Sequence, residues 1–448
     1  MNTPICDFIR KYTERDTLRL HMPGHKGKKY TGPEKYDITE VDGADSLYEA
    51  YGIIRESEKN AGNLFGTDTF YSTEGSSLCI RTMLYLALLD AKRSGKNPVV
   101  FAGRNAHKAF ITAAALLDFE IEWIYGKSET SYLSCIIDSE ELDIMLKNAK
   151  HMPAAVYLTS PDYLGNIADI GGISEVCRKY GVLLLVDNAH GAYLKFLSES
   201  QHPIDLGADM CCDSAHKTLP VLTGGAYLHI SKNASKFFKE RAKNAMGLFG
   251  STSPSYLILQ SLDAANRYIA EGYEERLESF LQKVEALKAK LSANGFYLSG
   301  NEPLKITIEP KNYGYTGNEL ADELLKRNIV CEFSDPDYIV LMLAPEIGEE
   351  GLAAIEKTMK DIPKKTPVCK KSPQIPRPER VLSVREAVFC ETEELPVHEC
   401  CGRILASINI SCPPAVSVIV CGERIDETAI ECFEYYGIDS CLVVAENI

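Results

Sequence analysis

The sequence lacks long apolar runs: no segment approaches the roughly 20 consecutive apolar residues that a membrane-spanning helix needs. Its first residues also lack the apolar stretch of a secretory signal peptide, because charged side chains are spread through residues 10–16. Both absences predict a cytoplasmic protein that has no membrane partner.

Basic side chains are in the minority, with 48 Lys and Arg against 63 Asp and Glu and a net charge of −15. A general nucleic-acid binder presents a basic surface, so no nucleic-acid partner is expected. The composition of 45% hydrophobic and 25% charged residues is typical of a globular protein. An acidic cleft in such a protein would attract a cationic substrate.

The 15 cysteines include no C-x-x-C pair, although eight of them lie between Cys369 and Cys441. Zinc knuckles are built from such pairs, so we expect no metal site. In the absence of an export signal, the thiols are interpreted as reduced and mostly buried.

Hydrophobic periodicity predicts an α/β fold. Apolar residues recur at helical spacing from Ser76 to Ala91, and short apolar strands then alternate with helices as far as Val186. Strands that are continuous Val/Leu runs are typical of a mostly parallel sheet covered on both faces. One long helical stretch is expected from about Tyr256 to Ala293. The predicted organisation is an amino-terminal arm (1–70), a large α/β domain (71–295), a small α+β domain (296–362), a linker (363–380) and a short carboxy-terminal domain (381–448).

Polar residues follow several of the predicted strands, where ligands bind in sheets of this kind. Asp187 ends the apolar run Val182–Val186, and Lys217 comes just after a second strand near Met210–Asp213. A pyridoxal phosphate site needs a lysine that forms a Schiff base and a carboxylate that keeps the pyridine nitrogen protonated. Taken singly, each residue fits a loop cap or a solvated charge equally well, so the prediction depends on the pair.

The helix that opens at Ser76 and Ser77, after Glu74-Gly75, offers a second feature of such a site. Backbone N–H groups and hydroxyls at a helix amino terminus can bind a phosphate, although the same residues also fit an ordinary cap.

The residues around Lys217 resemble the lysine motif of the ornithine/lysine/arginine decarboxylase family, within the aspartate-aminotransferase fold of pyridoxal phosphate enzymes. That motif is Ser214-Ala215-His216-Lys217-Thr218-Leu219-Pro220, followed by Thr223-Gly224-Gly225. Further matches occur in family order at Leu20–Gly27, Arg104–Lys108, Val186–Gly191 and Ser251–Tyr256. A weaker match continues through Gly402–Ile404 to Pro413-Pro414 and Gly422-Glu423. The resemblance covers nearly the whole chain, and the length resembles the short Gram-positive type.

The resemblance implies pyridoxal 5'-phosphate as cofactor and a role for each matched residue. Lys217 would form the Schiff base, Asp187 would bind the pyridine nitrogen, His107 would stack on the ring and His190 would lie beside it. The implied phosphate and ring contacts are Gly75, Ser76, Ser77, Ser214, His216, Ser251 and Thr252. Because sites in this fold lie at a dimer interface, Ser251 and Thr252 would reach the phosphate of a partner subunit, in a homodimer or a larger homo-oligomer.

The implied reaction is the α-decarboxylation of arginine, lysine or ornithine to an amine, in polyamine metabolism. Burying the second cation of such a substrate requires an acidic partner, for which Asp45 is the first candidate and Asp162 and Glu423 are the others.

Two alternatives remain at this point: an aminotransferase and a non-catalytic paralogue that binds the cofactor. Aminotransferases of this fold usually hold the substrate carboxylate with a small-domain arginine, yet Arg327 is the only arginine between Gly300 and Lys365. The presence of both Lys217 and Asp187 argues against a paralogue that has lost its activity.

The sequence departs from the family pattern at two places. Asn188 stands where the family usually has Glu, and Pro414-Ala415-Val416-Ser417 replaces the usual Pro-Gly-Ile-Pro run. The carboxy-terminal domain shapes substrate access in relatives, so the choice among the three amino acids stays open.

Overall fold

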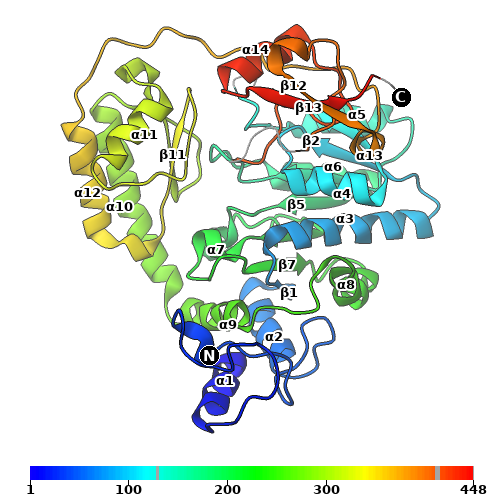
Figure 1. Cartoon of the computed structure of the whole chain (residues 1–448), viewed down its shortest axis with the longest axis vertical. Coiled ribbons are helices and arrows are strands. Elements are labelled where there is room, and N and C mark those ends of the chain that lie inside the picture. Colours follow the sequence, from blue (N-terminus) through cyan, green and yellow to red (C-terminus); the bar gives the residue numbers. More distant parts are fainter. Residues whose placement is uncertain (128–130, 409–413, 447–448) are drawn as a thin grey trace. The chain divides into compact units, whose positions relative to one another are not determined.

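The computed structural model describes residues 1–127, 131–408 and 414–446. The chain divides into two compact units, whose elements Figure 1 traces. The first unit comprises Met1–Asn97, Ala154–Tyr157 and Ile170–Arg276, and the second comprises Pro98–Pro153, Leu158–Asp169 and Leu277–Ile448.

Seven strands form one mostly parallel sheet in the order β1-β7-β6-β5-β4-β2-β3, which confirms the predicted fold class. The neighbours β5 and β6 run parallel, as do β2 and β3, whereas β7 is antiparallel to both β6 and β1. The strands are β1 (Asp68–Ser72), β2 (Val99–Gly103), β3 (Glu120–Ile124), β4 (Ala155–Thr159), β5 (Leu183–Asp187), β6 (Met210–Asp213) and β7 (Ala226–Ile230).

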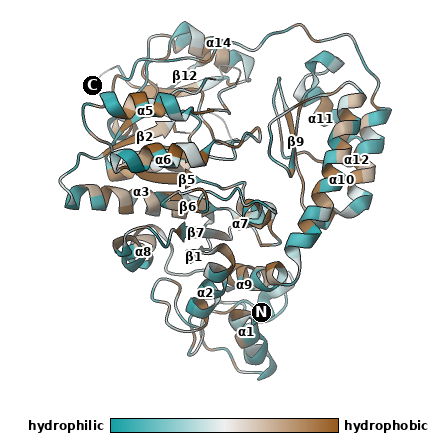
Figure 2. Ribbon diagram, turned by 180° about the vertical axis from the view of Figure 1, so that it is seen from behind, coloured by the Kyte–Doolittle hydropathy of each residue, from teal (hydrophilic) through white to brown (hydrophobic). Residues whose placement is uncertain are grey.

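The inner strands of the sheet are buried along almost their whole length. Every residue of β2, β6 and β7 is buried, as are four of the five residues of β5. Figure 2 accordingly colours β5 and its neighbours mainly as hydrophobic. Continuous burial of this kind is what a sheet covered on both faces requires.

The first unit, which contains Asp187 and Lys217, holds seven of the α-helices. They are α1 (Pro4–Glu14), α2 (Ile53–Phe65), α3 (Gly75–Arg93), α6 (Ile170–Tyr180), α7 (Ala215–Thr218), α8 (Lys236–Phe249) and α9 (Tyr256–Ala270). The amino-terminal arm therefore contains two full helices, α1 and α2. The buried carboxylate of Asp263 in α9 anchors α1, because its Oδ2 accepts the backbone N–H groups of Ile5 and Cys6 at 3.0 Å.

The long helical stretch expected over residues 256–293 is helical but is not one continuous helix. It consists of two helices, α9 and α10 (Tyr273–Ala293). Gly272 separates them with a φ of +80°, a left-handed conformation that glycine adopts without steric cost. Apolar periodicity continues through this break, so the pattern alone does not reveal it.

The second unit contains the remaining elements. Its helices are α4 (Lys108–Leu117), α5 (Ser139–Asn148), α11 (Gly317–Leu325), α12 (Gly348–Asp361), α13 (Val384–Phe389) and α14 (Glu427–Tyr435). A four-stranded antiparallel sheet has the order β10-β11-β9-β8, and β12 pairs with β13. These strands are β8 (Tyr297–Ser299), β9 (Lys305–Glu309), β10 (Phe333–Ser334), β11 (Ile339–Met342), β12 (Thr392–Pro396) and β13 (Ser440–Val444).

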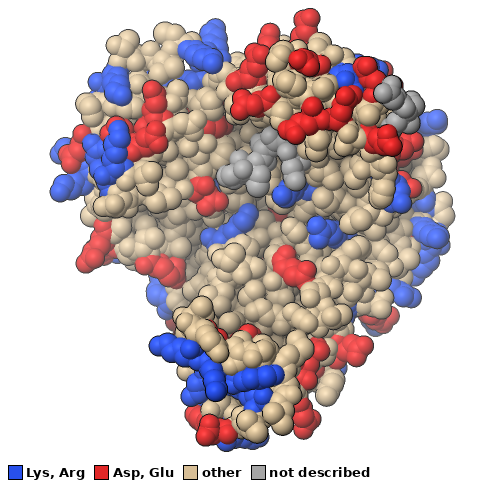
Figure 3. All heavy atoms as spheres, viewed as in Figure 1, with Lys and Arg blue, Asp and Glu red and all other residues tan. Residues whose placement is uncertain are grey.

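The carboxy-terminal part of the second unit is strongly acidic. Residues 381–448 carry 12 Asp and Glu against three Arg and no Lys. Figure 3 shows acidic side chains gathered at the upper end of the view, where Figure 1 draws β12, β13 and α14. Much of the net negative charge of the chain therefore belongs to this segment.

The predicted linker, residues 363–380, contains no helix or strand. The domain boundaries stay predictions, because the two compact units divide the chain at other positions. Among the described residues, no helix is both long and apolar enough to span a bilayer.

Candidate active site

Two neighbouring parallel strands of the first unit bring Asp187 and the lysine segment together. Asp187 is the last residue of β5 and pairs in register with Cys212 of β6. The chain leaves β6 at Asp213 and turns directly into the short helix α7, which carries Lys217. The Lys217 Nζ lies 2.9 Å from Nε2 of His190, on the turn after β5, so the two groups share a hydrogen bond.

The Asp187 carboxylate is almost completely buried, with 2% of its surface exposed. It accepts the Tyr157 hydroxyl at 3.2 Å, the Ala189 backbone N–H at 3.2 Å and the Cys212 thiol at 3.6 Å. Burial raises the pKa of Asp187, and the positive charge of Lys217 opposes that shift. A cation placed against this carboxylate would therefore favour its ionised form.

The amino terminus of α3 offers the backbone N–H groups of Ser76 and Ser77, whereas the Gly75 N–H donates to the Gly224 carbonyl oxygen at 2.8 Å. No side chain of the described residues caps this end, where Gly75, Ser76 and Ser77 begin the helix. The Ser214 hydroxyl donates to Oγ of Ser76 at 2.9 Å, which joins the lysine segment to the start of α3. A Cβ added to Gly75 would meet no atom within 4 Å, so there is open space beside this end. Uncapped N–H groups, two hydroxyls and open space suit an anion such as a phosphate.

Two further predicted cofactor residues, His216 and Ser251, have partners of their own in the first unit. His216 Nδ1 lies 2.9 Å from the carbonyl oxygen of Gly225, in the loop that follows α7. Ser251 and Thr252 are exposed, and the Ser251 backbone N–H donates to the Glu74 carboxylate at 2.6 Å. Glu74 immediately precedes α3, so the Ser251 segment is tied to that helix start.

His107 and two of the predicted substrate carboxylates belong to the second unit. His107 caps α4 by accepting the Ala109 N–H at 3.1 Å on Nδ1. Asp162 is 3% exposed and accepts both the backbone and the side-chain N–H of Asn166 at 2.9 Å. Glu423 is 3% exposed and pairs with Arg104 at 2.8 Å. Both carboxylates are therefore already engaged by neighbouring groups.

Asp45, the first candidate for the substrate cation, lies in the first unit and is 8% exposed. Its Oδ1 accepts the N–H groups of Ser46 and Tyr51, and its Oδ2 accepts those of Gly52, Ile54 and Arg55. Five backbone donors give Asp45 the structural role of holding the loop that enters α2. A role in substrate binding stays a prediction, and these contacts compete with it.

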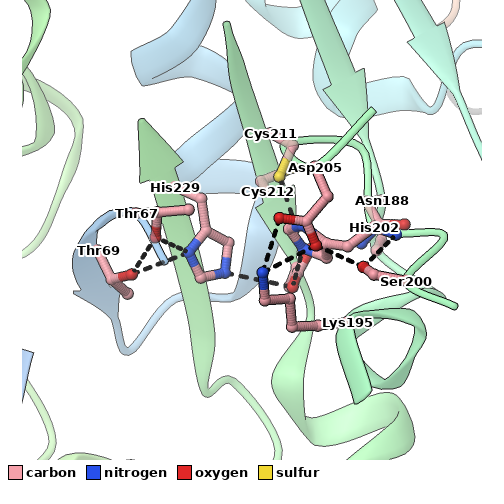
Figure 4. Close-up of polar contacts among 12 residues, drawn as sticks. Thr67, Thr69, Asn188, Lys195, Ser200, His202, Asp205, Cys211, Cys212 and His229 are labelled. Atoms are coloured by element: carbon pink, nitrogen blue, oxygen red, sulfur yellow. Dashed lines mark hydrogen bonds and ion pairs between the residues drawn. The ribbon is translucent and has the colours of Figure 1, made fainter. Parts of the chain in front are cut away.

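A second group of buried polar residues lies next to the site and was not predicted from the sequence. His202, Asp213 and His229 are completely buried, and Asn188 joins them through Asp213 (Figure 4). A signal was present, because a charged residue ending the buried strand Met-Cys-Cys-Asp requires a partner. Among the described residues, His202, Cys211 and Asp213 also form the one group of metal-ligand type, although no metal was expected.

Comparison with known proteins identifies the family. The sequence matches the Orn/Lys/Arg decarboxylase major domain over residues 3–311 and the Orn/Lys/Arg decarboxylase C-terminal domain over residues 370–438. An uncharacterized protein of Bacillus subtilis (strain 168) is 29% identical, over 96% of this chain and 93% of its own. An arginine decarboxylase of the same strain is 27% identical, over 99% of this chain and 95% of its own.

Solved structures with the same fold include two lysine decarboxylases. Lysine decarboxylase A from Pseudomonas aeruginosa has a TM-score of 0.82 at 16% identity and covers 99% of this chain and 80% of its own. The lysine decarboxylase of Francisella novicida has a TM-score of 0.81 at 16% identity, with 99% and 81% covered. An alanine–glyoxylate aminotransferase from Nostoc sp. has a TM-score of 0.55 at 19% identity, with 68% and 85% covered. At these identities the likeness shows the fold alone.

Proposed function

Because the chain belongs to the Orn/Lys/Arg decarboxylase family, whose members depend on pyridoxal phosphate, we propose that it removes the α-carboxylate of a basic amino acid. The substrate class is arginine, lysine or ornithine, and the product is the corresponding amine. The observation that carries the proposal is the hydrogen-bonded Lys217–His190 pair beside the end of β5, where the buried carboxylate of Asp187 lies.

The residues of the first unit fit the cofactor. Lys217 would hold it covalently, Asp187 would bind its pyridine nitrogen, and Ser76, Ser77 and Ser214 would bind its phosphate at the open end of α3. A buried carboxylate whose pKa is raised by burial favours a positively charged partner, as a protonated pyridine is. When bound, the cofactor supplies an electron sink for the bonding pair that carbon dioxide leaves behind.

The chain itself must position the substrate and supply a proton. His190 is 5% exposed and Asp187 is 2% exposed, so water has little access to either group. We assign Lys217 Nζ and His190 Nε2 as the pair that holds the proton needed at the Cα atom after carbon dioxide has left. Their 2.9 Å hydrogen bond lets that proton pass between them.

The second cation of the substrate needs a carboxylate, and all three candidates already have partners. Asp45 lies in the same unit as Lys217, but its oxygens accept five backbone N–H groups. Asp162 and Glu423 lie in the second unit, where Asn166 and Arg104 contact them. Replacing each by its amide and comparing the KM for the preferred amino acid distinguishes the three.

The contacts of Arg327 argue against the aminotransferase alternative. It lies just after α11 and donates to the Glu323 carboxylate at 2.8 Å and to the Glu323 carbonyl oxygen at 2.7 Å. A small-domain arginine that holds a substrate carboxylate would need its guanidinium free for that contact. Arg327 is instead committed to its own helix.

The test supplies the purified protein with cofactor and separately with arginine, lysine and ornithine, and identifies the amine released. Borohydride reduction followed by peptide mapping should place the pyridoxyl group on Lys217. Lys195, a lysine of the same unit paired with Asp205, provides the matched control, because Lys195→Gln should keep the label and Lys217→Ala should lose it. Release of no amine from any of the three, or a label on another lysine, would refute the proposal.

We further propose a homodimer or larger homo-oligomer in the cytoplasm that serves polyamine metabolism. The arm of the first unit supports a partner subunit, because several of its large apolar side chains are more than half exposed. These are Leu18, Leu20, Met22, Tyr30 and Tyr51. The cysteines of the described residues are all free thiols, as a reducing compartment requires. Light scattering on the purified protein measures the oligomer.

A further inference from the structure

Asp213, the residue before the lysine segment, lies at the centre of a buried polar network with His202, His229 and Asn188, three residues that Figure 4 labels. Its Oδ2 is 3.1 Å from Nε2 of His202 and 3.2 Å from Nε2 of His229, while its Oδ1 accepts the side-chain N–H of Asn188 at 2.7 Å. All four residues have 0% of their surface exposed. Both imidazoles approach the same carboxylate oxygen, and Nε2 of His202 forms a hydrogen bond with it.

The network keeps Asp213 charged. Burial alone would raise the pKa of Asp213, but the charges and hydrogen bonds of His202 and His229 outweigh it and hold that pKa well below its usual range. The other ring nitrogen of His229 lies 3.1 Å from the Thr67 hydroxyl and 2.9 Å from the Thr69 hydroxyl. When one of those hydroxyls donates to Nδ1, the proton of a neutral His229 lies on Nε2, which is 3.2 Å from Oδ2 of Asp213 in a close contact that does not have the geometry of a hydrogen bond.

Asn188 connects this carboxylate to the turn that follows β5. Its backbone N–H donates to the Cys212 carbonyl at 3.0 Å, and its own carbonyl accepts the Gly191 N–H at 2.8 Å. Its side-chain oxygen fits so closely against Gly191 that a Cβ there would lie 2.1 Å from it. Asn188 is therefore held on one side by Asp213 and on the other by the backbone of the turn.

Two parts of the proposed site meet through this contact. The turn of residues 187–191 begins at Asp187 and carries His190, which contacts Lys217. Asp213 is covalently joined to Ser214, whose hydroxyl reaches the start of α3. We propose that Asp213 is a positioning residue that, through Asn188, fixes the turn carrying Asp187 and His190 against the lysine segment. This inference rests on the proposed function, because it concerns the residues assigned to the cofactor.

The test measures cofactor affinity in apo-protein as well as turnover. Asp213→Asn keeps the size of the side chain but turns a donor toward the histidines, and Asn188→Ala removes the connection while leaving Asp213 and both histidines in place. Each variant should bind pyridoxal phosphate about tenfold more weakly, shift the visible absorption of the bound cofactor and lower kcat more than it changes KM. In the Asn188→Ala background, adding Asp213→Asn should change the affinity by less than about twofold, because the path through Asn188 is already broken.

A matched control separates positioning from general stability. Asp263 is also completely buried and accepts several donors, but these come from α1 and from Ser57 of α2 rather than from the turn. Asp263→Ala leaves these donors unpaired and should lower the melting temperature, while leaving the cofactor affinity of the folded protein within about twofold.

Each outcome decides the matter. The inference is overturned if the losses of cofactor affinity add up in the double variant. It is also overturned if Asn188→Ala has the affinity and the absorption spectrum of wild type, and this second test does not require that Asp213→Asn folds. One equivalent of metal in the purified protein that is lost in Asp213→Asn also overturns it, because Asp213 would then be a metal ligand with His202 and Cys211. A wild-type protein that binds no pyridoxal phosphate refutes the proposed function instead, so the two failures are distinguishable.

Discussion

Replacing Asp187 by Asn isolates the contribution of one buried negative charge. The two side chains have nearly the same size, so the change leaves no cavity and the contacts with Tyr157 and Ala189 can persist. The amide cannot hold a positive charge on the pyridine nitrogen of the bound cofactor. We expect turnover to fall while the fold is kept.

The size of the effect follows from the contact that is lost. A hydrogen bond to a charged group contributes about 1.5–3 kcal/mol, and each 1.36 kcal/mol changes a rate about tenfold. The expected loss in kcat is therefore between about tenfold and about 150-fold. Because Asp187 is 2% exposed, solvent screens the charge little, and a value near a hundredfold is expected.

Stability of the apo-protein should change in the opposite direction. Burial raises the folded-state pKa of Asp187 above its unfolded value, so a protonated Asp187 is favoured in the folded chain. The ionised carboxylate therefore lowers the unfolding free energy as the pH rises through that raised pKa. Asp187→Asn removes this cost, and its apo-form should melt no lower than wild type at pH 8.

The assay combines carbon dioxide release, cofactor titration and thermal melting. Asp209→Asn is the matched control, because Asp209 precedes β6 at the other end of the same two strands and accepts the Leu184 N–H at 2.8 Å. That variant should keep its kcat and, because burial raises the pKa of Asp209 as well, should melt no lower than wild type at pH 8. A wild-type kcat in Asp187→Asn, or an equal loss in Asp209→Asn, would refute the assignment of Asp187.

Three further predictions concern stability. Burial raises the pKa of Asp335 to about 7, whereas the unfolded chain releases this proton above about pH 4. The unfolding free energy therefore falls as the pH rises from about 4 to about 7. Asp335→Asn should therefore melt higher than wild type at pH 8 and the same at pH 4; equal melting temperatures at pH 8 would contradict this. Asp45→Ala should lower the unfolding free energy by about 0.5–2 kcal/mol with KM within twofold, whereas a tenfold rise in KM at unchanged stability would return Asp45 to the substrate site. Arg104→Met leaves Glu423 buried without its cation and should cost about 3–5 kcal/mol in urea unfolding, most of which Arg104→Met/Glu423→Leu should restore; an equally unstable double variant would argue against the pair.

Local patterns in the sequence were sufficient to predict the strands and helices of the parallel part of the sheet. The apolar run at residues 182–186 becomes β5, and the helix expected over residues 76–91 is α3. Both follow from side-chain periodicity within one element. The position of Asp187 after β5 follows as well, since the last residue of a parallel strand lies at the ligand-binding edge.

Local patterns do not predict which strands pair when they are far apart in the sequence. The sequence of β1, Asp-Thr-Phe-Tyr-Ser, has little of the apolar character of a buried strand, but its Thr69 lies opposite His229 of β7 and bonds to that ring. The hydroxyl of Thr69 is therefore satisfied by a strand 160 residues away. The contacts that occupy Asp45 are hidden for the same reason, because they depend on how the backbone folds around one carboxylate.

The hydrogen bond between Asn188 and Asp213 also constrains how this family can vary. One residue must donate and the other accept, and neither position is open to water. A Glu at position 188, which the resemblance to the family implies as its usual residue, would place a second carboxylate against Asp213 and bury two like charges together. Homologues that carry Glu at position 188 should therefore carry a hydrogen-bond donor, such as an amide or a hydroxyl, at position 213. The two positions are expected to change as a pair during evolution, with the charge moving from one strand end to its neighbour while the bond between them is kept.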